Sequence, residues 1–213
     1  MSIRPRITST LPAGTILLLF LSLCPAARAC DGTSSLTCNG QPQTYAGPSG
    51  SCSASSLFGG GKASFDVTQG RVYAAAQGGF GTGSADAATD DEYLVKGPGS
   101  GPVTLTAVLT SQPIINAGSG TLLIRQSTSN QNSRSLNEMD RFQTIYLPLT
   151  IQTAIGQAFA LHYEVSASAY STSQVDGVMS FTNLPAGVSV VSCRYLVTPV
   201  HATTWGQVRK IYH

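Results

Sequence analysis

The sequence carries little charge. Only 10% of its 213 residues are Asp, Glu, Lys or Arg, whereas an average soluble domain has roughly 25%. The 12 basic residues barely outnumber the 10 acidic ones. There is thus no basic excess to neutralise phosphate groups, which excludes a nucleic-acid-binding composition. The scarcity of Glu, Lys and Arg also excludes long helices and coiled coils, which are rich in these residues.

Long apolar runs are also scarce, and the clearest one lies near the N-terminus. It spans Thr15–Cys24, follows Arg4 and Arg6, and is itself followed by an A-x-A motif at residues 27–29. This order is typical of an export signal, and we expect cleavage after Ala29. The alternative is a transmembrane anchor, but the run is too short to span a bilayer and has no stop-transfer flank. Three basic residues would leave with the signal, so the formal net charge would fall from +2 to −1.

Four cysteines would remain in the exported chain: Cys30, Cys38, Cys52 and Cys193. Their spacing fits neither a CxxC motif nor a zinc pattern, and an even number in an exported protein predicts disulfides. Three connectivities are possible. We favour Cys30–Cys38, which would close a short N-terminal loop, with Cys52–Cys193, which would tie the start of the domain to its last strand. Lipid attachment at Cys30 is an alternative, although Arg28 makes a poor lipobox.

Alternation of apolar and polar residues dominates the middle of the chain. It is clearest in residues 158–170, where one predicted face holds Phe159, Leu161, Tyr163, Val165, Ala167 and Ala169. That period of two is typical of a half-buried strand. Further strands are expected at residues 63–68, 71–76, 92–95, 103–110, 121–126, 145–151, 178–182 and 188–197. Pro148 lacks an amide donor, which predicts an edge position or a bulge in its strand.

About nine strands separated by turn-rich loops predict an all-β fold, an antiparallel β-sandwich of jelly-roll-like form. We expect four segments: the signal peptide at 1–29, an irregular Cys/Gly/Ser-rich segment at 30–62, the sandwich at 63–197, and a linker with a short tail at 198–213. The polar stretch 127–141 is predicted to be an exposed loop with a helical turn near residues 136–139.

The C-terminal tail holds the single tryptophan of the chain. Its apolar residues lie at helical spacing and could contact a partner or the domain itself. These residues are Trp205, Val208, Ile211 and Tyr212.

No nucleophile or metalloprotease motif points to a catalytic residue. The sequence contains neither G-x-S-x-G nor H-E-x-x-H. His162 and Glu164 share one predicted strand face and could do acid–base chemistry, although such pairs more often face solvent. We therefore assign no catalytic residue and expect a protein that is not an enzyme.

Two weaker patterns point to ligands. Asp90, Asp91 and Glu92 form the densest acidic cluster, which could bind calcium or could be a solvated turn before a strand. We assign no metal or cofactor on this evidence. Three aromatic residues in or beside predicted loops could stack on a sugar ring or could pack at the edge of the domain. They are Tyr73, Phe80 and Tyr170.

Two segments, residues 91–108 and 151–195, carry short motifs such as Phe181-Thr-Asn-Leu-Pro-Ala-Gly-Val188. With these motifs the chain resembles uncharacterised secreted bacterial β-sandwich proteins that occur with PEP-CTERM or related C-terminal sorting tails. It departs from the anchored members because it has no Pro-Glu-Pro tripeptide and no terminal hydrophobic helix. The resemblance implies export and a β-sandwich, but supplies no catalytic residues.

The function expected from the sequence is an exported, non-enzymatic β-sandwich that acts as a structural or adhesive module. Its location would be periplasmic, at the cell surface or extracellular. Its partner would be a cell-surface component or a glycan, with no nucleic acid and no membrane-spanning segment in the mature chain. A carbohydrate-binding module is the alternative, and a small extracellular hydrolase that uses loop carboxylates is a third possibility.

Overall fold

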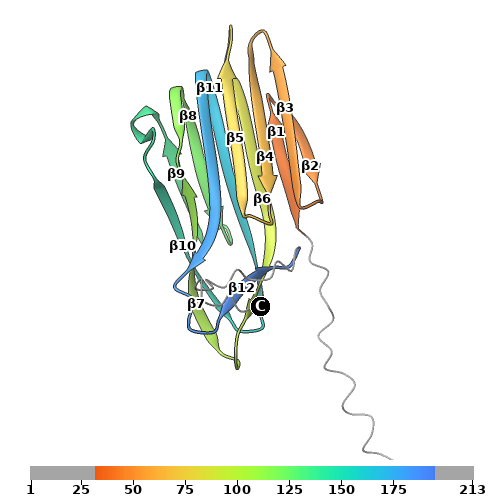
Figure 1. The fold of residues 1–213 in the computed structure, drawn as a ribbon, viewed down its shortest axis with the longest axis vertical. Coiled ribbons are helices and arrows are strands. Elements are labelled where there is room, and N and C mark those ends of the chain that lie inside the picture. Colours follow the sequence, from red (N-terminus) through yellow and green to blue (C-terminus); the bar gives the residue numbers. More distant parts are fainter. Residues whose placement is uncertain (1–31, 195–213) are drawn as a thin grey trace, which may run out of the picture.

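The computed structural model describes residues 32–194, and these form an antiparallel β-sandwich (Figure 1). The predicted all-β fold class is therefore confirmed. The predicted signal peptide, Cys30 and the tail with Trp205, Val208, Ile211 and Tyr212 lie outside the described residues. Twelve strands are present in the described part of the chain, more than the nine expected.

The strands form two layers, and two of the strands run through both. The front layer contains β3 (Ser49–Ser56), β4 (Gly59–Asp66), β5 (Arg71–Gly78), the second half of β11 (Ala158–Thr182), β7 (Pro102–Ser111) and β10 (Ile145–Ala154). The back layer contains β2 (Gln41–Tyr45), β1 (Thr33–Cys38), β6 (Gly83–Lys96), the first half of β11, most of β8 (Ile114–Arg125) and β9 (Gln131–Leu136). The short strand β12 (Ser189–Ser192) pairs with the end of β6.

Strands β8 and β11 pass together from one layer to the other. Their pairing is interrupted by a register shift between Ala169 and Thr172 of β11. On β8, Ala117 has a positive φ of 49° at the same level. A β-bulge of this kind bends a paired ribbon sharply. The bend lets one continuous strand pair with β6 in the back layer and with β5 in the front layer, which gives the jelly-roll-like form.

The core lies between the layers, as the alternation in residues 158–170 predicts. The six side chains on the predicted apolar face of this segment are all buried, and the residues between them point outward. Pro148 also lies as expected, on β10, which pairs with β7 alone. On the other side of β10, the side-chain amides of Asn130 and Asn132 donate to the Thr150 and Pro148 carbonyls at 3.0 and 2.8 Å.

The N-terminal segment differs from the prediction. Residues 30–62 were expected to be irregular, but the structure has β1, β2, β3 and the start of β4 there. The side chains that β1 buries are Ser34, Leu36 and Cys38, and β2 is mostly exposed. Polar residues occupy most positions of these strands, so the sequence shows no alternation of apolar and polar residues there. The sandwich therefore begins at Thr33 instead of Ala63.

The predicted disulfide pairing is wrong. Cys38 of β1 is bonded to Cys52 of β3, with a Cα–Cα distance of 6.1 Å. Neither Cys30–Cys38 nor Cys52–Cys193 can form alongside this bond. The two joined strands belong to different layers, so the disulfide links the back layer to the front layer near one edge of the sandwich.

Part of the predicted polar loop 127–141 is also a strand, β9. The expected helical turn is present as a 3-10 turn, η1 (Glu138–Asp140), slightly further along the chain than predicted. Asn137 caps this turn by accepting from the Met139 amide, and Asp140 accepts from Arg134 at 2.6 Å.

Candidate ligand-binding groove

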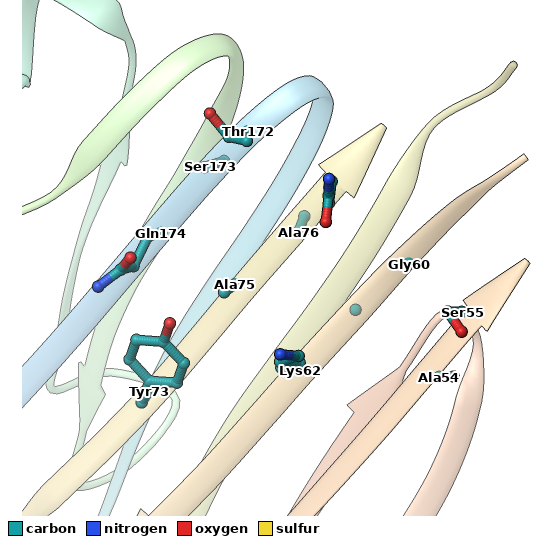
Figure 2. A pocket seen from close by; sticks show the side chains of 12 residues that line it. Ala54, Ser55, Gly60, Lys62, Tyr73, Ala75, Ala76, Thr172, Ser173 and Gln174 are labelled. Atoms are coloured by element: carbon teal, nitrogen blue, oxygen red, sulfur yellow. The ribbon is translucent and has the colours of Figure 1, made fainter. Parts of the chain in front are cut away.

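A shallow groove of about 250 Å³ lies on the outer surface of the front layer (Figure 2). Strands β3, β4, β5 and β11 each contribute to it. Its lining residues are Ala54, Ser55, Gly60, Gly61, Lys62, Tyr73, Ala75, Ala76, Gln77, Thr172, Ser173 and Gln174.

The strand alternation creates this groove. On β5, the outward positions are Tyr73, Ala75 and Gln77, so a short side chain lies between two long ones. Ala75 is paired with Lys62 on one side and with Gln174 on the other. The small side chain therefore forms a floor between longer ones, and Figure 2 shows Lys62, Tyr73 and Gln174 around it.

The long side chains around this floor are not engaged with the rest of the protein. Within the described residues, the side chains of Lys62, Gln77 and Gln174 make no hydrogen bond or ion pair. Tyr73 is half-buried, and burial, followed by the charge of Asp176, raises the pKa of its hydroxyl. The hydroxyl therefore stays neutral at ordinary pH and can both donate and accept. The groove thus offers an aromatic ring, two amides and one cation to a ligand.

The predicted pair His162 and Glu164 lies on the opposite face, on the back layer. The His162 Nδ1 is 2.8 Å from Asp90 Oδ1, and its Nε2 is 3.3 Å from Glu164 Oε2. Asp90, His162 and Arg125 are directly opposed across β6, β11 and β8. A hollow of about 380 Å³ borders this row of charges.

Both carboxylates hold the imidazole in its charged form. Hydrogen bonds to Asp90 and Glu164 raise the pKa of His162 to about 9, against the opposing effect of burial. The hydrogen bond with His162 in turn lowers the pKa of Asp90. An imidazolium that donates from both nitrogens has no lone pair to accept a proton at neutral pH. This geometry fits a charge-paired structural cluster better than a general base.

The acidic residues 90–92 do not converge on one point. They lie inside strand β6 and not in a turn before it, so consecutive side chains face opposite sides of the sheet. Asp90 and Glu92 point outward, whereas Asp91 is buried between the layers. Burial raises the pKa of Asp91, whose Oδ1 accepts from the Glu92 amide at 2.9 Å. Residues 32–194 contain no cluster of three or more His, Cys, Asp or Glu residues placed to hold a metal ion.

The three aromatic residues proposed for sugar stacking do not form one site. Tyr73 lines the groove, whereas Phe80 and Tyr170 lie at one end of the sandwich. Sequence reasoning missed Lys62, Gln77 and Gln174 as site residues. The alternation places them on outer faces, but only the strand pairing brings them around Ala75.

No family model, curated protein or solved structure matches this chain. The resemblance to secreted bacterial β-sandwich proteins therefore stays a prediction. In the described part of the chain, no helix has the length and apolar character needed to cross a membrane.

Proposed function

We propose that this protein is an exported, non-enzymatic adhesion module that holds a glycan in the front-layer groove. The observation that carries the proposal is the arrangement around Ala75. There, the Tyr73 ring and the unengaged side chains of Lys62, Gln77 and Gln174 surround a floor of small residues. The proposal joins the adhesive function and the carbohydrate-binding alternative that the sequence predicts.

The groove residues match the chemistry of a sugar. An aromatic ring can stack on the apolar face of a pyranose, while amides and hydroxyls bond to its hydroxyl groups. The lining side chains are short or make no hydrogen bond to the rest of the described chain. A ligand that binds there therefore breaks few existing interactions. The ammonium group of Lys62 is the single charged group among the lining residues, and it would favour a glycan that bears a carboxylate or sulfate.

Export is supported by the covalent structure of the protein. The Cys38–Cys52 disulfide joins two strands of different layers. Such bonds form and persist in oxidising compartments. A periplasmic, cell-surface or extracellular location belongs to the proposal on the same basis. Kinship with secreted bacterial β-sandwich proteins is also part of the proposal, and it rests on the motifs in residues 91–108 and 151–195.

A glycan array tests the proposal directly. The purified chain should bind a subset of glycans, and Tyr73→Ala should weaken that binding at least tenfold, because the stacking surface is lost. Tyr146→Ala is the matched control, since Tyr146 is an exposed tyrosine on the edge strand β10 and does not line the groove. Absence of binding to any glycan, or equal loss in both variants, would refute the proposal.

A further inference from the structure

Four large apolar or aromatic side chains protrude at one end of the sandwich. Leu57, Phe58, Phe80 and Tyr170 are between 69% and 88% exposed, and together we call them the apolar tip. They come from the β3–β4 turn, the β5–β6 loop and the bend in β11, which lie at the upper end of the molecule in Figure 1. Single exposed apolar residues are common, but a convergent group indicates an interaction surface.

Backbone contacts hold the segments of the tip together. The Phe80 amide donates to the Leu57 carbonyl at 3.0 Å. A Cβ atom on Gly78 would collide with the Tyr170 carbonyl, so glycine is needed where β5 approaches the bend. The exposed side chains are therefore presented by a connected scaffold and not by three independent loops.

The β3–β4 turn breaks a local sequence rule. Two-residue hairpin turns usually contain Asn, Gly or Asp, whereas here Leu57 and Phe58 occupy the turn. Bulky apolar residues gain nothing from packing there because both are mostly exposed. Departures of this kind, without a compensating gain in the fold, are typical of functional positions.

The segments that form the tip suit a medium without water. Residues 53–61, 77–85 and 168–175 contain no charged side chain, so burial of the tip would desolvate no ion. Several polar groups of the turns form local hydrogen bonds. The Phe58 amide donates to Ser56 Oγ, Ser56 Oγ donates to the Gly59 carbonyl, and the Gly79 amide donates to the Gly81 carbonyl. Internal satisfaction of backbone groups is the central requirement for contact with hydrocarbon.

Polarity then changes in steps along the sandwich. Directly below the tip, the strands of the front layer carry a row of outward side chains at paired positions. This row contains Ser55, Gln77 and Thr172, which are uncharged and belong to the groove. The next row contains the cation Lys62. An apolar end, an uncharged polar row and then a charge follow the order of the acyl region, the interface and the aqueous phase of a bilayer.

From these observations we infer that the apolar tip docks onto a lipid membrane surface, with its side chains inserted into the interfacial region. A second protein fits less well, because four protruding side chains cannot provide the roughly 800 Å² per partner that a stable protein interface buries. The tip carries no cation, so docking depends on apolar insertion and is insensitive to salt. The inference is independent of the ligand that occupies the groove.

Vesicle co-sedimentation tests this inference. The probe is phosphatidylcholine vesicles, with a second set that contains phosphatidylglycerol, and the protein is the chain from residue 30, without the predicted signal. We expect binding to both vesicle types at low and high salt. The double variant Phe58→Ser/Phe80→Ser should reduce binding at least tenfold, while its melting temperature stays unchanged because both side chains are exposed.

Tyr146→Ser and Tyr73→Ala serve as controls, and both should bind vesicles like the wild type. Any contribution from residues 195–213 is common to all these variants and therefore cancels. Three results would overturn the inference: no vesicle binding by the wild type, equal binding by the double variant, or binding confined to anionic vesicles and abolished by salt. Sedimentation velocity tests the alternative partner. If the wild type self-associates and the double variant does not, the tip would instead bind a second copy of the chain.

Discussion

The outer faces of the two layers use polar side chains in opposite ways. On the back layer, His162 bonds to Asp90 of the neighbouring strand β6 and to Glu164, two residues further along β11. On the front layer, Lys62, Gln77 and Gln174 surround a floor of small residues and bond to nothing in the described chain. Both faces are built on the same strand, β11, whose first half lies in the back layer and whose second half lies in the front layer.

This difference separates polar residues that stabilise a sheet from polar residues that are open to a ligand. Cross-strand charged pairs contribute to sheet stability, and removal of one partner leaves the others uncompensated. Unengaged side chains around a hollow contribute little to folding, so their arrangement points to binding. The back face is therefore interpreted as structural and the front face as functional.

Loss of the disulfide should have the largest effect and should separate the layers. Cys38→Ser should lower the free energy of unfolding by about 2–4 kcal/mol, which corresponds to roughly 5–15 °C in melting temperature. Hydrogen exchange should show greater loss of protection in β3 and β4 than in β8 and β11, because β3 forms the free edge of the front layer. Ser53→Ala, an outward neighbour on β3, is the control. A uniform loss of protection would contradict this prediction.

Peptide mapping without reductant should recover Cys38 linked to Cys52. A peptide that links Cys30 to Cys38 would contradict the structure.

A matched pair of substitutions on β11 compares the two faces directly. His162→Gln should lower the free energy of unfolding by about 1–2 kcal/mol at neutral pH, because the variant cannot carry the positive charge between Asp90 and Glu164. Gln174→Ala, an outward residue of the same strand in the groove, should change it by less than about 0.5 kcal/mol. Thermal melts measure both. Equal decreases in the free energy of unfolding for the two variants would contradict the assignment of a structural role to the back face alone.

The pH dependence of stability should report the same cluster. The pKa of His162 is raised from 6.5 to about 9 in the folded protein. The stabilisation that the charged His162 gives the folded protein is therefore fully present below pH 6.5. It is lost as the pH rises through about 9, where the folded protein releases this proton. The melting temperature of the wild type should fall by a few degrees between pH 7 and pH 10. The His162→Gln variant should lack this fall, and a parallel fall in both proteins would show that other groups cause it.

The smallest predicted effect concerns Tyr73 in the groove. Asp176→Asn should lower the pKa of the Tyr73 hydroxyl, because the nearby negative charge helps to keep it neutral. The pKa should stay above its ordinary value of 10, since burial is the larger cause. The pKa is measured by following phenolate absorbance as the pH is raised. Subtraction of the curve of the double variant Asp176→Asn/Tyr73→Phe from that of Asp176→Asn leaves the signal of Tyr73 alone. No shift on removal of the Asp176 charge would contradict the prediction.

The sequence predicts the fold best where apolar residues alternate. The buried face of β11 follows from its period of two, because each inward residue gains from burial. Strands β1, β2, β3 and β9 lack that pattern, since Ser, Gln and Asn occupy many of their positions. Their order depends on pairing with distant strands and, for β1 and β3, on the Cys38–Cys52 disulfide.

The candidate site is less predictable, because it depends on register between strands that are far apart in the sequence. Tyr73 was predicted from its aromatic character, but its neighbours Lys62 and Gln174 reach it only through the pairing of β4, β5 and β11. The pairing of β6 with β11 likewise joins His162 to Asp90, which is 72 residues away in the sequence. The sequence placed His162 beside Glu164 but gave no indication of the second carboxylate.

The proposed function is tested most directly by glycan affinity, measured by titration for wild type and for Ala75→Leu. This substitution fills the floor of the groove from an outward position, so it should leave the fold intact. Tyr73, Gln77, Gln174 and Lys62 all remain in place. We predict that glycan binding falls at least tenfold while the melting temperature stays unchanged. Undiminished glycan binding by Ala75→Leu would show that the groove is not the binding site.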